Sequence, residues 1–188
     1  MLLVRPTAEH LPSYVEALER GWSPNNERGI AATHEELARI QADPAAFLDS
    51  MDDRTASGLP VTMPDGSVVP RLPGFRRWMW DGEFAGNIGF RWQFGTAELP
   101  PYCLGHIGYS VVPWKQRRGY ATTALLQTLP EAKAIGLPYV ELTADLENIP
   151  SQKVILAAGG MLHERFIKPP QFGSKPCLKY RIILAPQG

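Results

Sequence analysis

Residues 105–122 read GHIGYSVVPWKQRRGYAT, and this stretch predicts a strand, a tight basic loop and the start of a helix. Inside it, Gln116 to Ala121 form the pattern Q-x-x-G-x-A, and residues 123–127 continue with the composition of a helix. A helix that opens on such a loop directs several unpaired backbone N–H groups and the positive end of its dipole toward one point. We therefore expect an anion to bind at this junction.

The side chains of the loop suit a large anion. Gly119 and Ala121 leave room for a diphosphate to approach the backbone, while Lys115, Arg117 and Arg118 add positive charge around it. On its own the hexapeptide is a weak signal, because strand-loop-helix turns of this kind also occur in proteins that bind nothing there. The residues that follow strengthen the interpretation.

A second strand-like run covers residues 139–145 and leads to Asn148 and Ser151 in the pattern N-x-x-S. A short apolar helix over residues 154–158 and a Gly-Gly-Met sequence come next. In this order and spacing, the segments resemble the GNAT superfamily of acyl-CoA-dependent N-acetyltransferases. The phosphate loop of that family starts with Gln or Arg, has Gly three residues later, and ends in Gly or Ala two residues after that.

The resemblance implies an α/β (α+β) fold with a mixed, mainly antiparallel central sheet and helices on both faces. It also implies that the fourth strand, which enters the basic loop, and the fifth, residues 139–145, splay apart. A chain of 188 residues can bury one sizeable core, so we predict a single domain over residues 1–188.

Turn and cap signals place the elements before the loop. We expect Thr7 to cap a helix that runs to Arg20, and Thr33 to open a second helix that Pro44 breaks. A turn at residues 64–66 predicts a small hairpin, and Asp81-Gly82 predicts a clear hairpin between residues 75–80 and 84–92. Glycines inside its second strand indicate a bulge or a close backbone approach.

The elements after the loop follow from periodicity. Residues 121–132 predict a helix that Gly136 ends, with a kink or restart at Pro130. The alternation over residues 177–184 predicts a last strand, antiparallel to residues 161–167.

Composition excludes several function classes. Lys and Arg number 19 and Asp and Glu number 19, so no basic field would draw nucleic acid or an anionic membrane. No segment is long and apolar enough for a signal peptide or a membrane span, and we expect a cytoplasmic protein. Cys103 and Cys177 lack the paired spacing of a zinc site, so we expect neither a metal nor a disulfide. The sequence leaves open whether the protein forms a homodimer.

The resemblance also implies acetyl-CoA as co-substrate, held in the splay with its thioester at backbone N–H groups of the fourth strand and its diphosphate on the loop. Carried over by position, the contacts are those of Ser110, Val111, Val112, Gln116, Arg117, Arg118, Gly119, Tyr120, Ala121, Thr122, Asn148 and Ser151.

Two residues are catalytic candidates. Counting back from the loop, His106 falls near the catalytic glutamate of some family members, and a histidine titrates in the range that a general base needs. The alternatives are a strand-end histidine bonded to backbone, with Glu141, His163 or water as the base. For the departing thiolate, the helix after residues 139–145 lacks the family's usual tyrosine, which leaves Ser151 as proton donor or, alternatively, as a first-turn residue bonded to its own helix.

An acceptor pocket is expected between the early helices and the splay. Its candidate wall residues are Tyr14, Trp22, Trp78, Trp80, Arg91 and Trp92. Because Trp78 and Trp80 share a strand face and Trp92 lies in the pairing strand, a packed aromatic cluster is the alternative to a ligand cage.

The function that the sequence favours is an N-acetyltransferase that transfers an acetyl group from acetyl-CoA to a primary amine by direct attack in a ternary complex. The acceptor would be a small-molecule amine or a protein N-terminus. One alternative is a non-catalytic acyl-CoA-binding sensor or scaffold of the same fold. A nucleotide-binding regulatory module is a third, although neither G-K-S/T nor G-x-G-x-x-G occurs.

Overall fold

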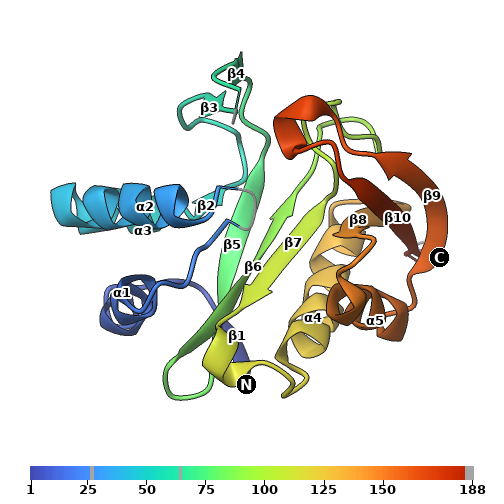
Figure 1. Ribbon diagram of the computed structural model, residues 1–188. Helices are drawn as coiled ribbons and strands as arrows, with labels where there is room; N and C mark the ends of the chain where they lie inside the picture. The colour runs from blue at the N-terminus through green and yellow to red at the C-terminus, as the bar shows by residue number, and fades with distance from the viewer. Residues whose placement is uncertain (26–27, 64, 185–188) are drawn as a thin grey trace.

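Two antiparallel sheets form the centre of the molecule (Figure 1). The computed structural model describes residues 1–25, 28–63 and 65–184. The first sheet has the order β1 (Leu2–Val4), β5 (Gly74–Trp80), β6 (Phe84–Arg91) and β7 (Ile107–Val111), and β2 (Asp52–Asp53) also pairs with β5. The second has the order β8 (Tyr139–Asp145), β10 (Pro176–Ile183) and β9 (Met161–Ile167).

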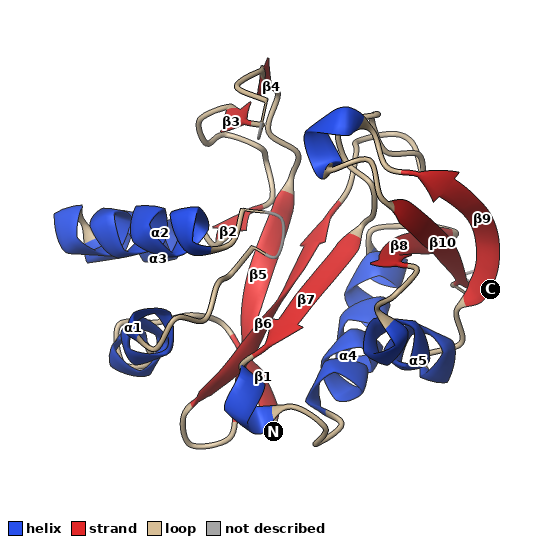
Figure 2. Cartoon of the chain, in the orientation of Figure 1, coloured by secondary structure: helices blue, strands red, loops and turns tan. Residues whose placement is uncertain are grey.

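Helices cover both faces of the first sheet (Figure 2). On one side lie α1 (Leu11–Glu19), α2 (Ile30–Ala42) and α3 (Pro44–Asp49), and on the other lies α4 (Tyr120–Ala134). The remaining helix, α5 (Ile149–Ala157), lies beside α4 and β8, and short 3-10 turns occur at Pro113–Lys115 and Pro170–Phe172. This arrangement confirms the expected mixed α/β fold.

The splay is visible where the two sheets meet. β7 ends the first sheet and β8 begins the second, and the strand ladders of the described residues do not pair them. They are joined at one end only, where the His106 N–H donates to the Glu141 carbonyl at 2.7 Å. From this vertex the strands part, as Figure 1 shows on the side of β7 that faces α4 and α5.

The hairpin predicted around Asp81-Gly82 is confirmed as β5 and β6, and its register shifts between Met79 and Trp80. Gly86 lies opposite Met79 with φ 154°, and a Cβ there would come 2.3 Å from the Ser110 carbonyl oxygen. The close backbone approach expected in this strand therefore occurs at Gly86. The smaller hairpin is also confirmed as β3 (Val61–Thr62) and β4 (Val68–Val69), and position 64 of its predicted turn lies outside the described residues.

Two predicted helix starts are wrong. α1 begins at Leu11 after a turn in which the Thr7 hydroxyl bonds to the His10 ring at 2.7 Å instead of capping the helix. α2 begins at Ile30, so Thr33 lies inside the helix, where its hydroxyl donates to the Trp22 carbonyl at 3.1 Å. The Thr7 hydroxyl is thus used by a neighbouring side chain in the turn, and the Thr33 hydroxyl by the backbone of the segment that follows α1.

Of the two prolines that were expected to interrupt a helix, one does so and the other does not. Pro44 separates α2 from α3 as predicted, and Asp43 caps α3 through its bond from the Ala46 N–H. Pro130 does not restart the helix, because α4 continues through it to Ala134. Leu126 is exposed, so its carbonyl, which Pro130 deprives of a partner, lies on the solvent side of α4.

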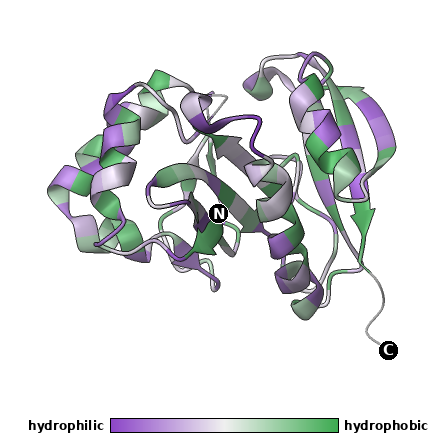
Figure 3. Cartoon of the chain, turned by 90° about the horizontal axis from the view of Figure 1, so that it is seen from below, coloured by the Kyte–Doolittle hydropathy of each residue, from purple (hydrophilic) through white to green (hydrophobic). Residues whose placement is uncertain are grey.

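Two apolar cores flank the first sheet. One lies between that sheet, α4 and the second sheet, and the other is an aromatic cluster between the sheet and α1 to α3. In the second core Tyr14 stacks on Trp78 with ring centroids 4.3 Å apart. Figure 3 shows the molecule from below, with hydrophobic residues on the strands that lie between α1 to α3 on one side and α4 and the second sheet on the other. None of the helices that the structure describes is long and apolar enough to cross a membrane.

Candidate active site

A cleft of about 1420 Å³ follows the splay. Its walls come from β5, β6 and β7 on one side and from β8 and α5 on the other, and the start of α4 closes one end. Every residue that the sequence assigned to acetyl-CoA lines this cleft except Val112 and Arg118.

The predicted anion site is built as the loop pattern requires. Gly119 is the N-cap of α4 with φ 77°, and a Cβ placed on it would meet nothing within 4 Å. No described residue accepts a hydrogen bond from the backbone N–H groups of Tyr120, Ala121 or Thr122. These donors, with the exposed Arg117 side chain beside them, face the cleft at the positive end of a 15-residue helix.

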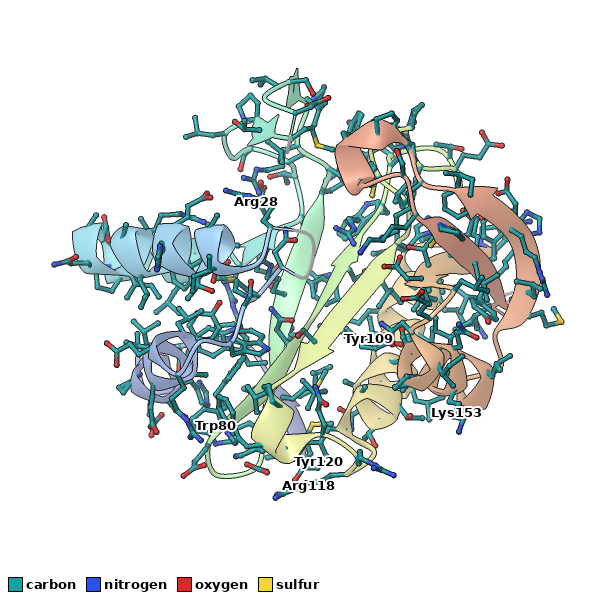
Figure 4. All side chains as sticks on the ribbon, viewed as in Figure 1. Arg28, Trp80, Tyr109, Arg118, Tyr120 and Lys153 are labelled. Atoms are coloured by element: carbon teal, nitrogen blue, oxygen red, sulfur yellow. The ribbon has the colours of Figure 1, made fainter. Side chains whose placement is uncertain are left out.

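Lys115 does not belong to the anion site, contrary to the prediction. Its ammonium is buried and bonds to Asp81 at 2.6 Å and to Glu83 at 3.2 Å. Tyr120 donates its hydroxyl to the same Asp81 at 2.7 Å, and Arg118 lies 4.0 Å from it. Figure 4 shows Tyr120 and Arg118 together at the foot of α4. Lys115 therefore anchors the loop to the β5–β6 turn, and the charge that is left for an anion is mainly that of Arg117.

The backbone donors of β7 differ from those predicted. Hydrogen bonds alternate along an antiparallel ladder, and the bonds Arg91 N–H to His106 and Val112 N–H to Ala85 fix their phase. The N–H groups of Ser110 and Val112 therefore point at β6. Those of Tyr109 and Val111 point into the splay, in agreement with the Gln116 amide, which reaches the Val111 carbonyl from that side at 3.3 Å.

The far wall carries Asn148 and Ser151, and a residue of β7 that sequence reasoning missed reaches across to them. Asn148 caps α5 by accepting from the Ser151 N–H at 3.1 Å, so the Ser151 hydroxyl is not used as a cap. That hydroxyl bonds instead to the Tyr109 hydroxyl at 2.9 Å across the splay. Tyr109 points toward α5 in Figure 4 because it faces the opposite way from Ser110 on β7. Alternation along the strand was the signal that could have indicated it.

Burial raises the pKa of Tyr109 to about 12, against a smaller opposing effect of its bond to Ser151. The phenol is therefore protonated at every pH at which the protein would work. The phenol can donate to the Ser151 carbonyl oxygen at 3.2 Å or to the Ser151 Oγ, and in the second case the Ser151 O–H is free to donate into the cleft.

His106 is fully buried and does not line the cleft, so the geometry does not favour its predicted role as general base. Its Nδ1 accepts from the Glu141 N–H at 3.0 Å, in the way that a backbone carbonyl would. Burial lowers the pKa of the imidazole from 6.5 to about 4. The alternative interpretation fits: His106 holds β7 to β8 at the vertex of the splay.

The other candidate bases also lie outside the cleft. Glu141 bonds to Arg181 at 2.7 Å, and His163 is exposed on β9. The candidate aromatic walls form core instead of a ligand cage: Tyr14, Trp22 and Trp78 pack together under α1, while Trp92 packs against Phe90. Of the six predicted wall residues, Arg91 lines the cleft. Among the described residues, no group of three or more His, Cys, Asp or Glu side chains is placed to hold a metal ion.

Comparison with known proteins identifies the family and the fold. The profile of the family described as "Acetyltransferase (GNAT) domain" matches residues 1–161. No curated protein matches the chain. The solved structure of a spermidine N-acetyltransferase chimera from Vibrio cholerae and hSSAT is similar, with a TM-score of 0.62 and 11% identity over 97% of this chain and 94% of that chain.

Two further structures contain relevant ligands. The ribosomal α-N-protein acetyltransferase RimL in complex with coenzyme A has a TM-score of 0.60 and 12% identity over 97% of this chain and 93% of that chain. The self-immunity acetyltransferase MccE in complex with acetyl-CoA and AMP has a TM-score of 0.59 and 12% identity over 97% and 91%. At these identities the likeness concerns the fold. The family profile, which spans most of the chain, and the splayed sheet with its phosphate loop together show that this chain belongs to the GNAT acetyltransferase family.

Proposed function

We propose that the protein transfers an acetyl group from acetyl-CoA to a primary amine by direct attack in a ternary complex. The observation that carries the proposal is one continuous cleft with unpaired donors of the right kind at two places. The open N-terminus of α4 lies at one end, and the N–H groups of Tyr109 and Val111 lie along the β7 wall.

In this arrangement the diphosphate of acetyl-CoA sits on the backbone N–H groups of Tyr120, Ala121 and Thr122, with Arg117 beside it. The pantetheine arm runs between β7 and α5, where Asn148 and Ser151 line the wall. The thioester then lies near Tyr109 and Val111, whose N–H groups can stabilise the oxyanion that forms when the amine attacks.

The amine must lose a proton before or during attack, because an ammonium has no free electron pair. His106 is buried and the cleft-lining Glu36 is bonded to Tyr14 and Arg76, so we assign the proton to water in the cleft. The Tyr109 and Ser151 hydroxyls serve the leaving thiolate. A phenol with a pKa of about 12 holds its proton more tightly than a thiol of ordinary pKa, about 8.5, so the pair stabilises the thiolate by hydrogen bonding instead of transferring a proton to it.

Calorimetry with acetyl-CoA, CoA and ATP, followed by a thiol-release assay over a panel of amines, tests this function. Binding of acetyl-CoA with amine-dependent thiol release supports it. Binding of acetyl-CoA without turnover on any amine would favour the sensor, and binding of ATP alone would favour the nucleotide module.

Gly119→Val is expected to weaken acetyl-CoA binding at least tenfold, roughly 1.4 kcal/mol, because the new side chain enters the space left for the diphosphate. Its matched control is Gly136→Val at the other end of α4. Gly136 has φ 91° and no neighbour within 4 Å, so the backbone strain is similar and the site is untouched. Equal affinities of the two folded variants in calorimetry would refute the assignment of the phosphate loop.

A further inference from the structure

Two glycines form a floor in the cleft on the side that α1 and α2 cover. Gly89 of β6 lies directly opposite Gly108 of β7, and both line the cleft. They are on the same face as Arg76, which is opposite Gly89 on β5 and bonds to Glu36 of α2. We call this pair the glycine floor.

The fold does not need glycine at either position. Neither has a positive φ. A Cβ on Gly89 would lie 3.6 Å from the nearest atom of Arg76, an ordinary contact, and one on Gly108 would meet only the flexible end of Arg91 at 3.2 Å. Glycine inside a strand costs stability, so the absence of side chains here calls for another reason. An empty floor beside the β7 donors gives an acceptor room to approach the thioester.

Two polar side chains border the floor and have hydrogen-bonding groups that no described residue uses. Asn87 is 5% exposed and lines the cleft, and its carboxamide takes part in none of the side-chain hydrogen bonds of the described residues. Arg91 is fixed by its Nε, which donates to the Gly105 carbonyl at 2.9 Å. Its two Nη groups have no hydrogen-bond or carboxylate partner in the described part of the chain, and one of them is the group that reaches over Gly108.

The carboxylates on this side are already engaged. Glu36 accepts from the Tyr14 hydroxyl and, at its other oxygen, from Arg76 at 2.7 Å. Burial raises the pKa of Tyr14, so its hydroxyl keeps its proton. Glu36 therefore has little negative charge left for a second cation.

The other carboxylates of this wall also have partners. Glu35 pairs with Arg28, and Asp53 accepts from two backbone N–H groups of its own loop at 2.9 Å each. Within the described residues, the acceptor side thus offers a free guanidinium and no free carboxylate. Charge complementarity disfavours a polycation and favours an acceptor that brings its own anion.

We infer that the acceptor is a small primary amine that also carries an oxyanion, a carboxylate or a phosphate: it lies on the glycine floor, with Arg91 binding the anion and Asn87 positioning the amine near the thioester. This inference rests on the proposed function. Because Arg91 reaches over Gly108 while Asn87 is two residues before Gly89 on the same face of β6, amine and anion are separated by only a few atoms.

Matched acceptors test the inference in the thiol-release assay with acetyl-CoA. The pairs are β-alanine and propylamine, 4-aminobutyrate and butylamine, L-leucine and 3-methylbutylamine, and phosphoethanolamine and ethanolamine, with spermidine as the polycation. The wild-type protein is expected to prefer at least one anionic member over its neutral partner at least tenfold in kcat/KM. The carboxylate and phosphate pairs distinguish the two sources of the anion.

Arg91→Gln should reduce kcat/KM for the anionic member at least tenfold and leave its neutral partner nearly unchanged, while Arg71→Gln, at the rim of the cleft, keeps the preference. Gly89→Ala should reduce kcat/KM for the acceptor with the acetyl-CoA affinity intact. A preference for spermidine or for neutral amines, or equal losses for both members of a pair in Arg91→Gln, would overturn the inference and leave the proposed function standing. If the protein binds acetyl-CoA but turns over none of the anionic acceptors, the inference is also overturned. A protein that does not bind acetyl-CoA would overturn both.

Discussion

Replacement of His106 by alanine is expected to lower the free energy of unfolding by about 3 kcal/mol, while turnover per folded molecule stays within tenfold. The side chain is fully buried, and its removal leaves a cavity and an unpaired N–H of Glu141 between β7 and β8. Denaturant unfolding and the thiol-release rate, measured on the same preparation, give the two quantities.

The difference in unfolding free energy between wild type and His106→Ala should also depend on pH, because the imidazole is buried. The pKa of His106 falls from 6.5 in the unfolded chain to about 4 in the fold, so between these values the unfolded state binds more protons. The stability that the neutral imidazole contributes is complete above pH 6.5 and is lost as the pH falls toward 4, an effect of about 3 kcal/mol. The stability difference between wild type and His106→Ala should therefore shrink over this range.

His163→Ala is the control, because His163 is exposed on β9 and should change neither the stability nor its pH slope. A general base would behave differently. If a stably folded His106 variant loses turnover a hundredfold, and the acidic limb of its pH–rate profile near pH 6.5 disappears, the catalytic role that the sequence suggested is restored.

Tyr109→Phe is expected to slow thioester cleavage about a hundredfold in single-turnover experiments, with the acetyl-CoA affinity unchanged within about threefold. A hydrogen bond to a developing charge is worth about 1.5–3 kcal/mol, and the thiolate carries that charge only late in the reaction. Ser151→Ala should give a similar loss, since either change breaks the Tyr109–Ser151 pair. The double variant should lose little more than either single one.

Tyr139→Phe is the matched control, because Tyr139 is half-buried on β8 and does not line the cleft. If Ser151→Ala loses stability without losing rate, the hydroxyl pair is a packing feature and the thiolate leaves without help from the protein. An acetyl-CoA affinity that falls in proportion to the rate would instead place the pair in ground-state binding.

Several parts of this protein follow from contiguous residues. The β5–β6 hairpin depends on the Asp81-Gly82 turn, and the phosphate loop depends on a strand, a glycine and a helix start within 18 residues. The N-x-x-S segment likewise gives a helix cap at Asn148. Backbone geometry over such short distances is fixed by the residues themselves, so the sequence was enough to predict the helix start at Gly119.

The roles of individual side chains depended on partners far away in the chain. Lys115 is taken from the anion site by Asp81, and His106 is made structural by Glu141, 35 residues later. Tyr109 of β7 bonds to Ser151 of α5, 42 residues away, across the splay. The sequence by itself thus determined the family, the hairpin turn and the helix start after the loop, and through the family it implied the splay. The tertiary structure decided which side chains face the cleft, because burial, long-range pairing and the phase of the β6–β7 ladder arise only when distant segments pack together.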